Sequence, residues 1–435
     1  MTANPRPHHA DLDRERSRLA GVYSQTRART DALAARLSPE DQQLQSMPDA
    51  SPAKWHRAHT TWFFETFVLA PAGLGPVDER YGYLFNSYYD AVGPRHARAK
   101  RGLLSRPTAA EIGDYRRTVD ERMAQLLATA GAGVLSRVLP VVELGIAHEE
   151  QHQELLLTDI LHAFSENPLH PAFLEGRAHG RVEVRIGNET RFVAFEGGLQ
   201  MVGAHPDGSF VFDNETPRHK QWIEPFELSD RLVTYGELKE FIRAEGYRTP
   251  SLWLAEGYEL VRANDVTAPL YCDFRDGTLS TFSLAGMRLP ADDEPLVHVS
   301  YYEADAIARF LGARLPTEME WELAAASRAV RGNFVDDGVL HPMPASPSAD
   351  APAVRQLFGD AWEWTRSSYE AYPGYQTPAG ALGEYNGKFM VSQRVLRGGS
   401  CLTPQRHVRA TYRNFWPPHT RFQMAGIRLA REVRA

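Results

Sequence analysis

Apolar residues recur at helical spacing along the first 170 residues of the chain, in four separate stretches. In the first stretch, Leu19, Val22 and Leu33 fall roughly on one side of a helix. Ser51 and Pro52 open the second stretch as a capping residue followed by a proline at the first helical position. The pattern therefore predicts helices over residues 11–37, 51–67, 108–130 and 141–164. Four helices joined by irregular links favour an up-down bundle, and metal sites in bundles are built from side chains on facing helices.

The pattern changes after Pro168. Val182, Val184 and Ile186 alternate with polar residues, as in a strand, and a Gly-Asn turn follows. Short strands separated by Gly, Pro, Asn and Asp then dominate, and shorter helices are predicted over residues 234–245, 300–311 and 317–326. The chain is therefore predicted to be an α+β protein, with a helical domain over residues 1–170 and a second domain over residues 180–435.

Composition restricts the classes of partner. The chain has 435 residues, which favours two domains, and its 48 basic against 55 acidic side chains give a formal net charge of −7 without a basic block. Nucleic acid is therefore not an expected partner. No run approaches the ~20 apolar residues of a membrane span, and the N-terminus lacks the apolar core of a signal peptide. Two cysteines, Cys272 and Cys401, give no disulfide framework, which fits a cytoplasmic protein. The sequence does not indicate an oligomeric state.

Two histidines stand four residues apart in the fourth predicted helix. His148 and His152 would lie on one face, with Cβ atoms roughly 5–6 Å apart, close enough to share a metal ion. The alternative is two unrelated histidines, one buried and one solvated. His59, on the second predicted helix, offers a third imidazole, and three nitrogens with open positions favour a catalytic site. His56 lies one turn earlier on nearly the same face, and spacing alone does not choose between the two.

The ligand types leave the metal open, since three imidazoles without a carboxylate suit zinc, copper, iron or nickel. The pattern His-Glu-x-x-His is also the zinc-protease signature, in which Glu149 would be the general base. No histidine follows at the spacing of the longer protease motif, and Glu149 and Glu150 are expected at a solvated helix edge rather than in a cleft. A protease is therefore disfavoured.

The C-terminal half carries a series of motifs in a fixed order. They include residues 195–198 (FEGG), 212–219 (FDNETPRH), 295–300 (PLVHVS), 314–322 (RLPTEMEWE), 359–364 (GDAWEW), 396–400 (LRGGS) and 426–428 (GIR). The series resembles the formylglycine-generating-enzyme (sulfatase-modifying factor) domain and implies its C-type-lectin-like fold. Those enzymes use cysteine ligands after the RGGS stretch, where this chain has only Cys401, so formylglycine-generating activity is not expected.

The N-terminal half is similar to a DinB-type four-helix bundle. Joined to the second domain, it resembles the ergothioneine-biosynthesis sulfoxide synthases (EgtB), from about residue 15 to residue 430. Four stretches carry this resemblance: residues 55–65 (WHRAHTTWFFE), 84–96 (LFNSYYDAVGPRH), 148–152 (HEEQH) and 383–390 (GEYNGKFM).

The resemblance implies a non-haem Fe(II) centre whose ligands are His59, His148 and His152, with His56 packed beside it. It also implies oxidative carbon–sulfur bond formation, with O2 as co-substrate, between imidazole C2 of hercynine and a thiol such as cysteine or γ-glutamylcysteine. The product would be a thioether sulfoxide. The helical domain would hold the metal, and the second domain would complete the substrate pocket.

The same resemblance suggests which side chains serve the reaction. Either Tyr88 or Tyr89 would supply a proton, and the sequence does not choose between them. Arg95 and Arg98 offer forked, permanently charged partners for the carboxylate of the thiol substrate. Gln151 would contact the imidazole of hercynine, directly or through water.

Residues Asn414, Phe415 and Trp416 match the family stretch that holds the trimethylammonium group, which binds well to aromatic faces. Some family members have an acidic residue at the position of Trp416 that contacts the thiol substrate, so the donor stays open, with the Tyr88-Tyr89 pair favouring cysteine. The alternatives are a selenosugar donor, giving selenoneine, or attack on histidine. A zinc-dependent DinB-type thiol transferase and a lectin-like binding module are the alternatives from other classes.

Overall fold

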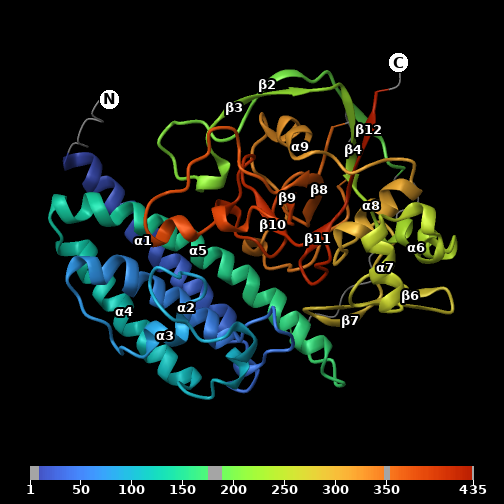
Figure 1. Ribbon diagram of the computed structural model, residues 1–435. Helices are drawn as coiled ribbons and strands as arrows, with labels where there is room; N and C mark the ends of the chain where they lie inside the picture. The colour runs from blue at the N-terminus through green and yellow to red at the C-terminus, as the bar shows by residue number, and fades with distance from the viewer. Residues whose placement is uncertain (1–8, 175–188, 347–352, 434–435) are drawn as a thin grey trace. The chain divides into compact units, whose positions relative to one another are not determined.

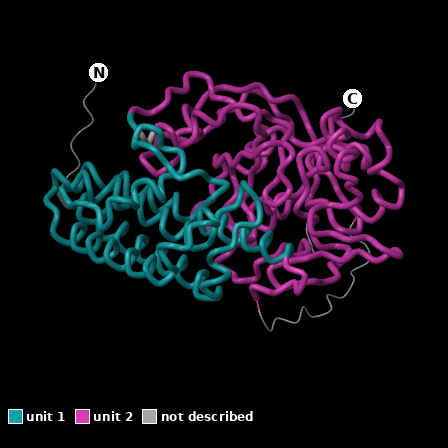
Figure 2. The backbone as a smooth tube through the Cα atoms, turned by 60° about the horizontal axis from the view of Figure 1, so that its bottom comes forward, with its two compact units in different colours: residues 1–166, 380–382 teal, residues 167–379, 383–435 magenta. Residues whose placement is uncertain are grey.

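The computed structural model describes residues 9–174, 189–346 and 353–433. The chain divides into two compact units, coloured separately in Figure 2. Unit 1 contains residues 1–166 and 380–382, and unit 2 contains residues 167–379 and 383–435. The strand predicted at Val182, Val184 and Ile186 lies outside the described residues.

Unit 1 is a bundle of four long helices, as the apolar periodicity predicts (Figure 1). Helix α1 packs along α5, α5 along α2, and α2 along α4. The fourth predicted helix begins nine residues earlier than expected and continues through Pro140. The helices are α1 (His9–Ala34), α2 (Ala53–Phe64), the short α3 (Tyr81–Phe85), α4 (Ala109–Thr129) and α5 (Ala132–Ser165).

A glycine lets α2 and α5 approach closely. A Cβ atom on Gly145 would stand 2.5 Å from the ring of Phe64 and 2.9 Å from the ring of Phe63, closer than van der Waals contact allows. His148 follows Gly145 by about one turn of α5, and His59 precedes Phe63 by about one turn of α2. The close approach therefore lies beside the expected metal ligands.

The helix starts only partly follow the sequence prediction. Thr108 caps α4 in a reciprocal capping box with Glu111, which explains why that helix begins where expected. Ser51 does not cap α2, which begins at Ala53 after an extended Pro52. Arg101 donates instead to Ser51 Oγ at 2.9 Å, so a long-range partner takes the oxygen that would have bonded the helix N-terminus.

Unit 2 combines four small sheets with short helices, which confirms the mixed α and β prediction for this half. The three predicted helices are present, and each opens with a capping box. One further helix, α7, was not predicted, and its N-cap Leu254 offers no capping side chain. The helices are α6 (Tyr235–Arg243), α7 (Ala255–Ala263), α8 (Tyr301–Phe310) and α9 (Glu318–Ala325).

The sheets of unit 2 are mostly antiparallel. Their orders are β1-β4-β12, β10-β9-β8-β11, β2-β3 and β5-β6-β7, and among the described strands only β11 and β8 pair in parallel. The strands are β1 (Phe192–Phe195), β2 (Gly198–Val202), β3 (His219–Ile223), β4 (Phe226–Leu232), β5 (Cys272–Arg275), β6 (Thr278–Ser283), β7 (Gly286–Arg288), β8 (Trp362–Ser368), β9 (Arg394–Arg397), β10 (Asn414–Trp416), β11 (Ala425–Gly426) and β12 (Arg428–Glu432).

The motifs of unit 2 meet in a buried ionic cluster. Arg397, from the RGGS motif, donates to Glu318 at 2.8 Å and to Glu322 at 3.0 Å. Arg413 binds the same Glu318 carboxylate at 2.9 and 3.0 Å. These charges are almost fully buried, so removal of one would leave its partners uncompensated. The RLPTEMEWE and RGGS motifs are thus joined by buried ion pairs.

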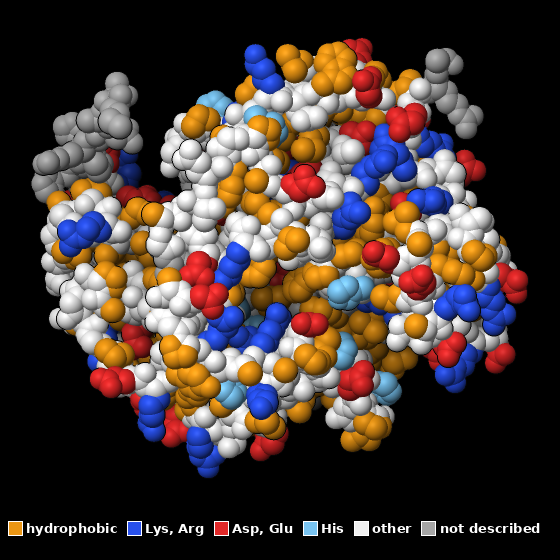
Figure 3. Space-filling model, in the orientation of Figure 1, with side chains coloured by type: hydrophobic (Ala, Val, Ile, Leu, Met, Phe, Trp, Pro, Cys, Tyr) orange, Lys and Arg blue, Asp and Glu red, His pale blue; other side chains and the backbone are white. Residues whose placement is uncertain are grey.

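The surface carries both signs of charge. On the face shown in Figure 3, basic and acidic side chains are interspersed, with apolar patches between them. Among the residues that the structure describes, no helix has the length and apolar content needed to cross a membrane.

Candidate metal centre

Three histidines of unit 1 converge on one point. His59 comes from α2, His148 and His152 come from α5, and their nearest ring nitrogens all lie within 4.8 Å of one another. The Nε2 atoms of His59 and His148 are 3.2 Å apart. Two nitrogens bound to one ion at about 2.1 Å would be separated by about 3.0 to 3.4 Å for right-angled to tetrahedral arrangements. The spacing therefore fits two ligands of a shared metal ion.

The orientation of His59 is fixed from three sides. Its Nδ1 lies 2.6 Å from the carbonyl oxygen of Phe85, so Nδ1–H donates and Nε2 keeps the lone pair that a metal needs. Trp55 stacks on the imidazole at 4.6 Å between ring centroids, and Trp62 stacks at 5.6 Å. The short helix α3 thus contributes to the site by supplying the carbonyl of its last residue, Phe85.

All three imidazoles are held neutral. Burial lowers the pKa of His148 to about 3. Burial, reinforced by the neighbouring His148, also holds the pKa of His59 and of His152 well below the ordinary histidine value. A histidine must be neutral to bind a metal, so the site is ready for an ion without losing protons. Three such nitrogens without a carboxylate fit iron, zinc, copper or nickel.

Glu149 is not at a solvated helix edge, and neither is Glu150; both are buried. Arg27 donates to the Glu149 carboxylate at 2.9 Å, and Arg116 and Thr30 each donate to it at 2.6 Å. Burial alone would raise the pKa of Glu149, but Arg116 and Arg27 reverse this and hold it at about 2. Sequence spacing could not reveal these partners, because they come from α1 and α4. The Glu149 carboxylate is bound in a buried ionic network, so it is not available as the general base that a zinc protease would need.

Tyr88 and Tyr89 lie together near Trp62, one of the two tryptophans that stack on His59. Their hydroxyl oxygens are 3.5 Å apart, and either can be the donor. Tyr89 is fully buried, while Tyr88 is partly exposed. The ring of Tyr89 is 5.8 Å from that of Trp62, which stacks on His59. The pair is therefore joined to the histidines through one indole ring.

Arg95 and Arg98 are exposed and engage local partners. Arg95 forms an ion pair with Asp90, and Arg98 donates to the carbonyl oxygen of Asp49. Neither residue is therefore preorganised by burial for a substrate carboxylate.

Arg101 was not predicted as a site residue, although it continues the three-residue spacing of Arg95 and Arg98. It is only 3% exposed, and its guanidinium carbon lies 3.4 Å from the centroid of the Trp55 ring. Burial, helped by the charge of Arg98, lowers the pKa of Arg101 to about 9. A buried cation on the indole that stacks on His59 brings positive charge to the centre.

Two further candidate site residues of unit 1, Gln151 and His56, lie close to the three histidines in sequence or in space. Gln151 is partly exposed on α5, between His148 and His152 in sequence. His56 is buried, and the ligand group contains His59 instead of it. Both ring nitrogens of His56 have other hydrogen-bond partners, so geometry selects His59 where spacing left the choice open.

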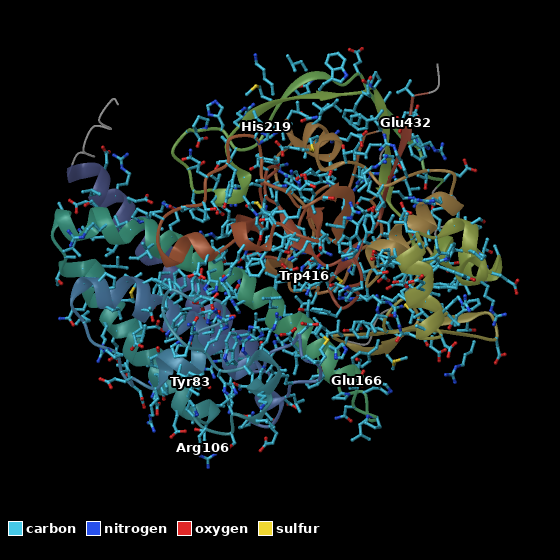
Figure 4. The ribbon with its side chains drawn as sticks, viewed as in Figure 1. Tyr83, Arg106, Glu166, His219, Trp416 and Glu432 are labelled. Atoms are coloured by element: carbon cyan, nitrogen blue, oxygen red, sulfur yellow. The ribbon has the colours of Figure 1, made fainter. Side chains whose placement is uncertain are left out.

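The predicted residues for the trimethylammonium group form β10 of unit 2. Asn414, Phe415 and Trp416 pair antiparallel with β9, and all three are partly exposed. Phe415 stacks on Tyr369 at 4.0 Å between ring centroids. Figure 4 labels Trp416 within unit 2, amid densely packed side chains. The strand therefore presents an aromatic surface that has not lost all solvent access.

Comparison with known proteins agrees with the two-unit architecture. Residues 181–433 match the sulfatase-modifying factor enzyme 1-like domain, and residues 23–156 match the DinB superfamily. The two matches confirm the predicted fold of each half.

Full-length relatives share both halves. The hercynine oxygenase of Mycobacterium tuberculosis is 32% identical over 443 residues, covering 95% of this chain and 99% of the relative. The hercynine oxygenase of Mycolicibacterium thermoresistibile is 31% identical, covering 100% of this chain and 97% of the relative. That of Mycolicibacterium smegmatis is 31% identical over 89% of this chain and 92% of its own length. An oxygenase is an oxidoreductase, so this chain is an enzyme of that class. The chain belongs to the hercynine oxygenase family.

Proposed function

We propose that this protein joins imidazole C2 of hercynine to a thiol in an O2-dependent reaction of ergothioneine biosynthesis. Full-length similarity to hercynine oxygenases supports the substrate, and the site of three neutral imidazoles supports the chemistry. The reaction balances as hercynine plus thiol plus O2 giving a thioether sulfoxide and water. The observation that carries the proposal is the convergence of His59, His148 and His152 on one point.

Fe(II) is the metal that we assign to these three histidines, and when bound it would supply O2 activation and stabilise the thiolate. The protein side chains do the rest. The Phe85 carbonyl orients His59, and the stacked indoles of Trp55 and Trp62 exclude water from that ligand. Tyr88 or Tyr89 would hold the proton that the reacting oxygen needs.

Substrate charges would be met by different groups. Arg95 and Arg98 would pair with the carboxylate of the thiol, and buried Arg101 would add positive charge beside them. Gln151 would contact the imidazole of hercynine. Within unit 2, the β10 residues Asn414, Phe415 and Trp416 would recognise its trimethylammonium group, which suits aromatic faces.

Oxygen consumption tests the proposal. Protein reconstituted with Fe(II) under anaerobic conditions is expected to take up O2 only when hercynine and a suitable donor are both present. The donors to compare are cysteine, γ-glutamylcysteine and a selenol, with histidine as a substitute for hercynine. Mass spectrometry should identify the sulfoxide or the selenium product. Absence of O2 uptake with every donor would contradict the proposal, and O2-independent thiol transfer by the zinc form would instead favour a DinB-type transferase.

The two tyrosines can be separated by removing one hydroxyl at a time. Tyr88→Phe or Tyr89→Phe is expected to lower single-turnover product formation by ~10²–10⁴-fold if that hydroxyl donates the proton, whereas loss of the other should cost far less. If the second hydroxyl, 3.5 Å away, does not replace the first, the double variant should be no slower than the slower single variant. Tyr83→Phe, at an exposed tyrosine, is the control. Equal, small effects in all three variants would exclude the pair as proton donor.

A further inference from the structure

A continuous hydrogen-bonded chain leads away from one metal ligand into the bundle. His152 Nδ1 lies 2.8 Å from His56 Nδ1, and His56 Nε2 lies 3.0 Å from Asp159 Oδ2. The backbone N–H of Ser51 donates to the same Asp159 oxygen at 2.8 Å. His56 and Asp159 are buried, so water does not compete for the bond between them. Asp159 follows His152 by two turns of α5 and thus lies on the same face.

From this chain we infer that His56 and Asp159 act as positioning residues that fix the ring tautomer of His152, and thereby its strength as a metal ligand. The inference rests on metal binding by the three histidines and not on which substrates react there.

The hydrogens along the chain can be placed in order. A carboxylate oxygen only accepts hydrogen bonds, so Asp159 Oδ2 accepts from both Ser51 N–H and His56. The hydrogen of His56 therefore lies on Nε2. With the hydrogen of His56 on Nε2, its Nδ1 carries a lone pair, so the short contact to His152 places a hydrogen on His152 Nδ1. That leaves the lone pair of His152 on Nε2, the nitrogen that remains for the metal.

An acceptor behind a metal-bound imidazole does more than orient it. Hydrogen bonding to the second ring nitrogen increases the basicity of the ligand, and loss of such a partner typically weakens metal affinity by ~10–100-fold. For His59 the Phe85 carbonyl has this role, and for His152 the pair of His56 and Asp159 would have it. Two of the three ligands are thus held in the same tautomer by unrelated parts of unit 1.

Cobalt binding tests the inference without the reaction. His56→Phe removes both hydrogen bonds at similar ring size, and the full-length apo protein should then bind Co(II) ~10–100-fold more weakly, measured by competition with a chelator and by the visible Co(II) spectrum. His56→Asn places an amide oxygen near the former Nδ1 and should restore part of the affinity. His162→Phe, on the same helix and bonded to Ser46 at 2.8 Å, is the control and should bind as the unchanged protein does.

Each result either supports or contradicts the positioning role of His56 and Asp159. Wild-type Co(II) affinity in a folded His56→Phe variant would overturn the inference, as would weakened binding that His56→Asn does not improve, since that result would indicate a packing role. If His56→Phe does not fold, histidine nitrogen NMR of the unchanged zinc-loaded protein still tests it: a hydrogen on His152 Nδ1 and on His56 Nε2 is expected, and the reverse tautomers would overturn it. A protein that binds Co(II) as described but never consumes O2 would contradict the proposed reaction alone.

Discussion

His152→Ala is expected to abolish iron binding and turnover while leaving the bundle folded. Among the residues that the structure describes, His152 is one of three histidines that could hold the ion together, so its loss should reduce metal affinity by orders of magnitude. It is also the partly exposed member, whereas His59 lies between two indole rings, so truncation of His152 should disturb packing least. Iron content after anaerobic reconstitution, together with far-ultraviolet circular dichroism, measures both expectations.

His96→Ala is the matched control for this experiment. His96 is a histidine of the same unit, but its ring bonds the carbonyl oxygen of Lys100 and packs against Tyr83, away from the ligand group. Its removal should leave one iron per chain. An iron content of one per chain in His152→Ala would show that the ligand set is wrong.

Glu149→Ala is expected to lower the free energy of unfolding by about 3 kcal/mol, because it leaves two buried guanidinium groups, those of Arg27 and Arg116, with only their more exposed partners Asp120 and Asp31. Urea unfolding followed by circular dichroism measures the loss. Glu143→Ala removes a partner of the more exposed Arg18 and should cost at most about 1 kcal/mol. Similar losses in the two variants would mean that the buried network contributes no more than a surface pair.

Acid should act on the same network. The pKa of Glu149 is held at about 2, below the ordinary glutamate value of 4.5 that applies in the unfolded chain. Its contribution to stability is therefore complete above that ordinary value and is lost as the pH falls from there toward 2. The unfolding free energy of Glu149→Ala should accordingly depend less on pH across this acidic range than that of the unchanged protein.

The sequence predicted those features that depend on nearby residues. Helical periodicity located the four long helices, and Thr108 with Glu111 marked the start of α4 because a capping box lies within one turn. Spacing placed His148 and His152 on one face because four residues make about one turn. Ser51 looked like a cap by the same local rule, but its oxygen is bonded by Arg101, which is distant in sequence.

Long-range partners explain what the sequence missed. Glu149 looked solvated because its two arginines lie on other helices. The choice between His56 and His59 depended on Asp159, which is about a hundred residues away and occupies one nitrogen of His56. Tertiary contacts therefore account for the burial of Glu149 and for the presence of His59, and not His56, in the histidine group.

The gap left by Gly145 has a consequence for any transplantation of this site. Because Gly145 has no Cβ, the axes of α2 and α5 can come close together. That spacing fixes the distance between the imidazole nitrogens that would bind an ion. A host bundle could receive the three histidines but carry a larger residue at the position of Gly145. Its two helix axes would then lie farther apart. Such a graft would favour a larger ion or only two ligands, so the glycine must be transferred as part of the coordination motif.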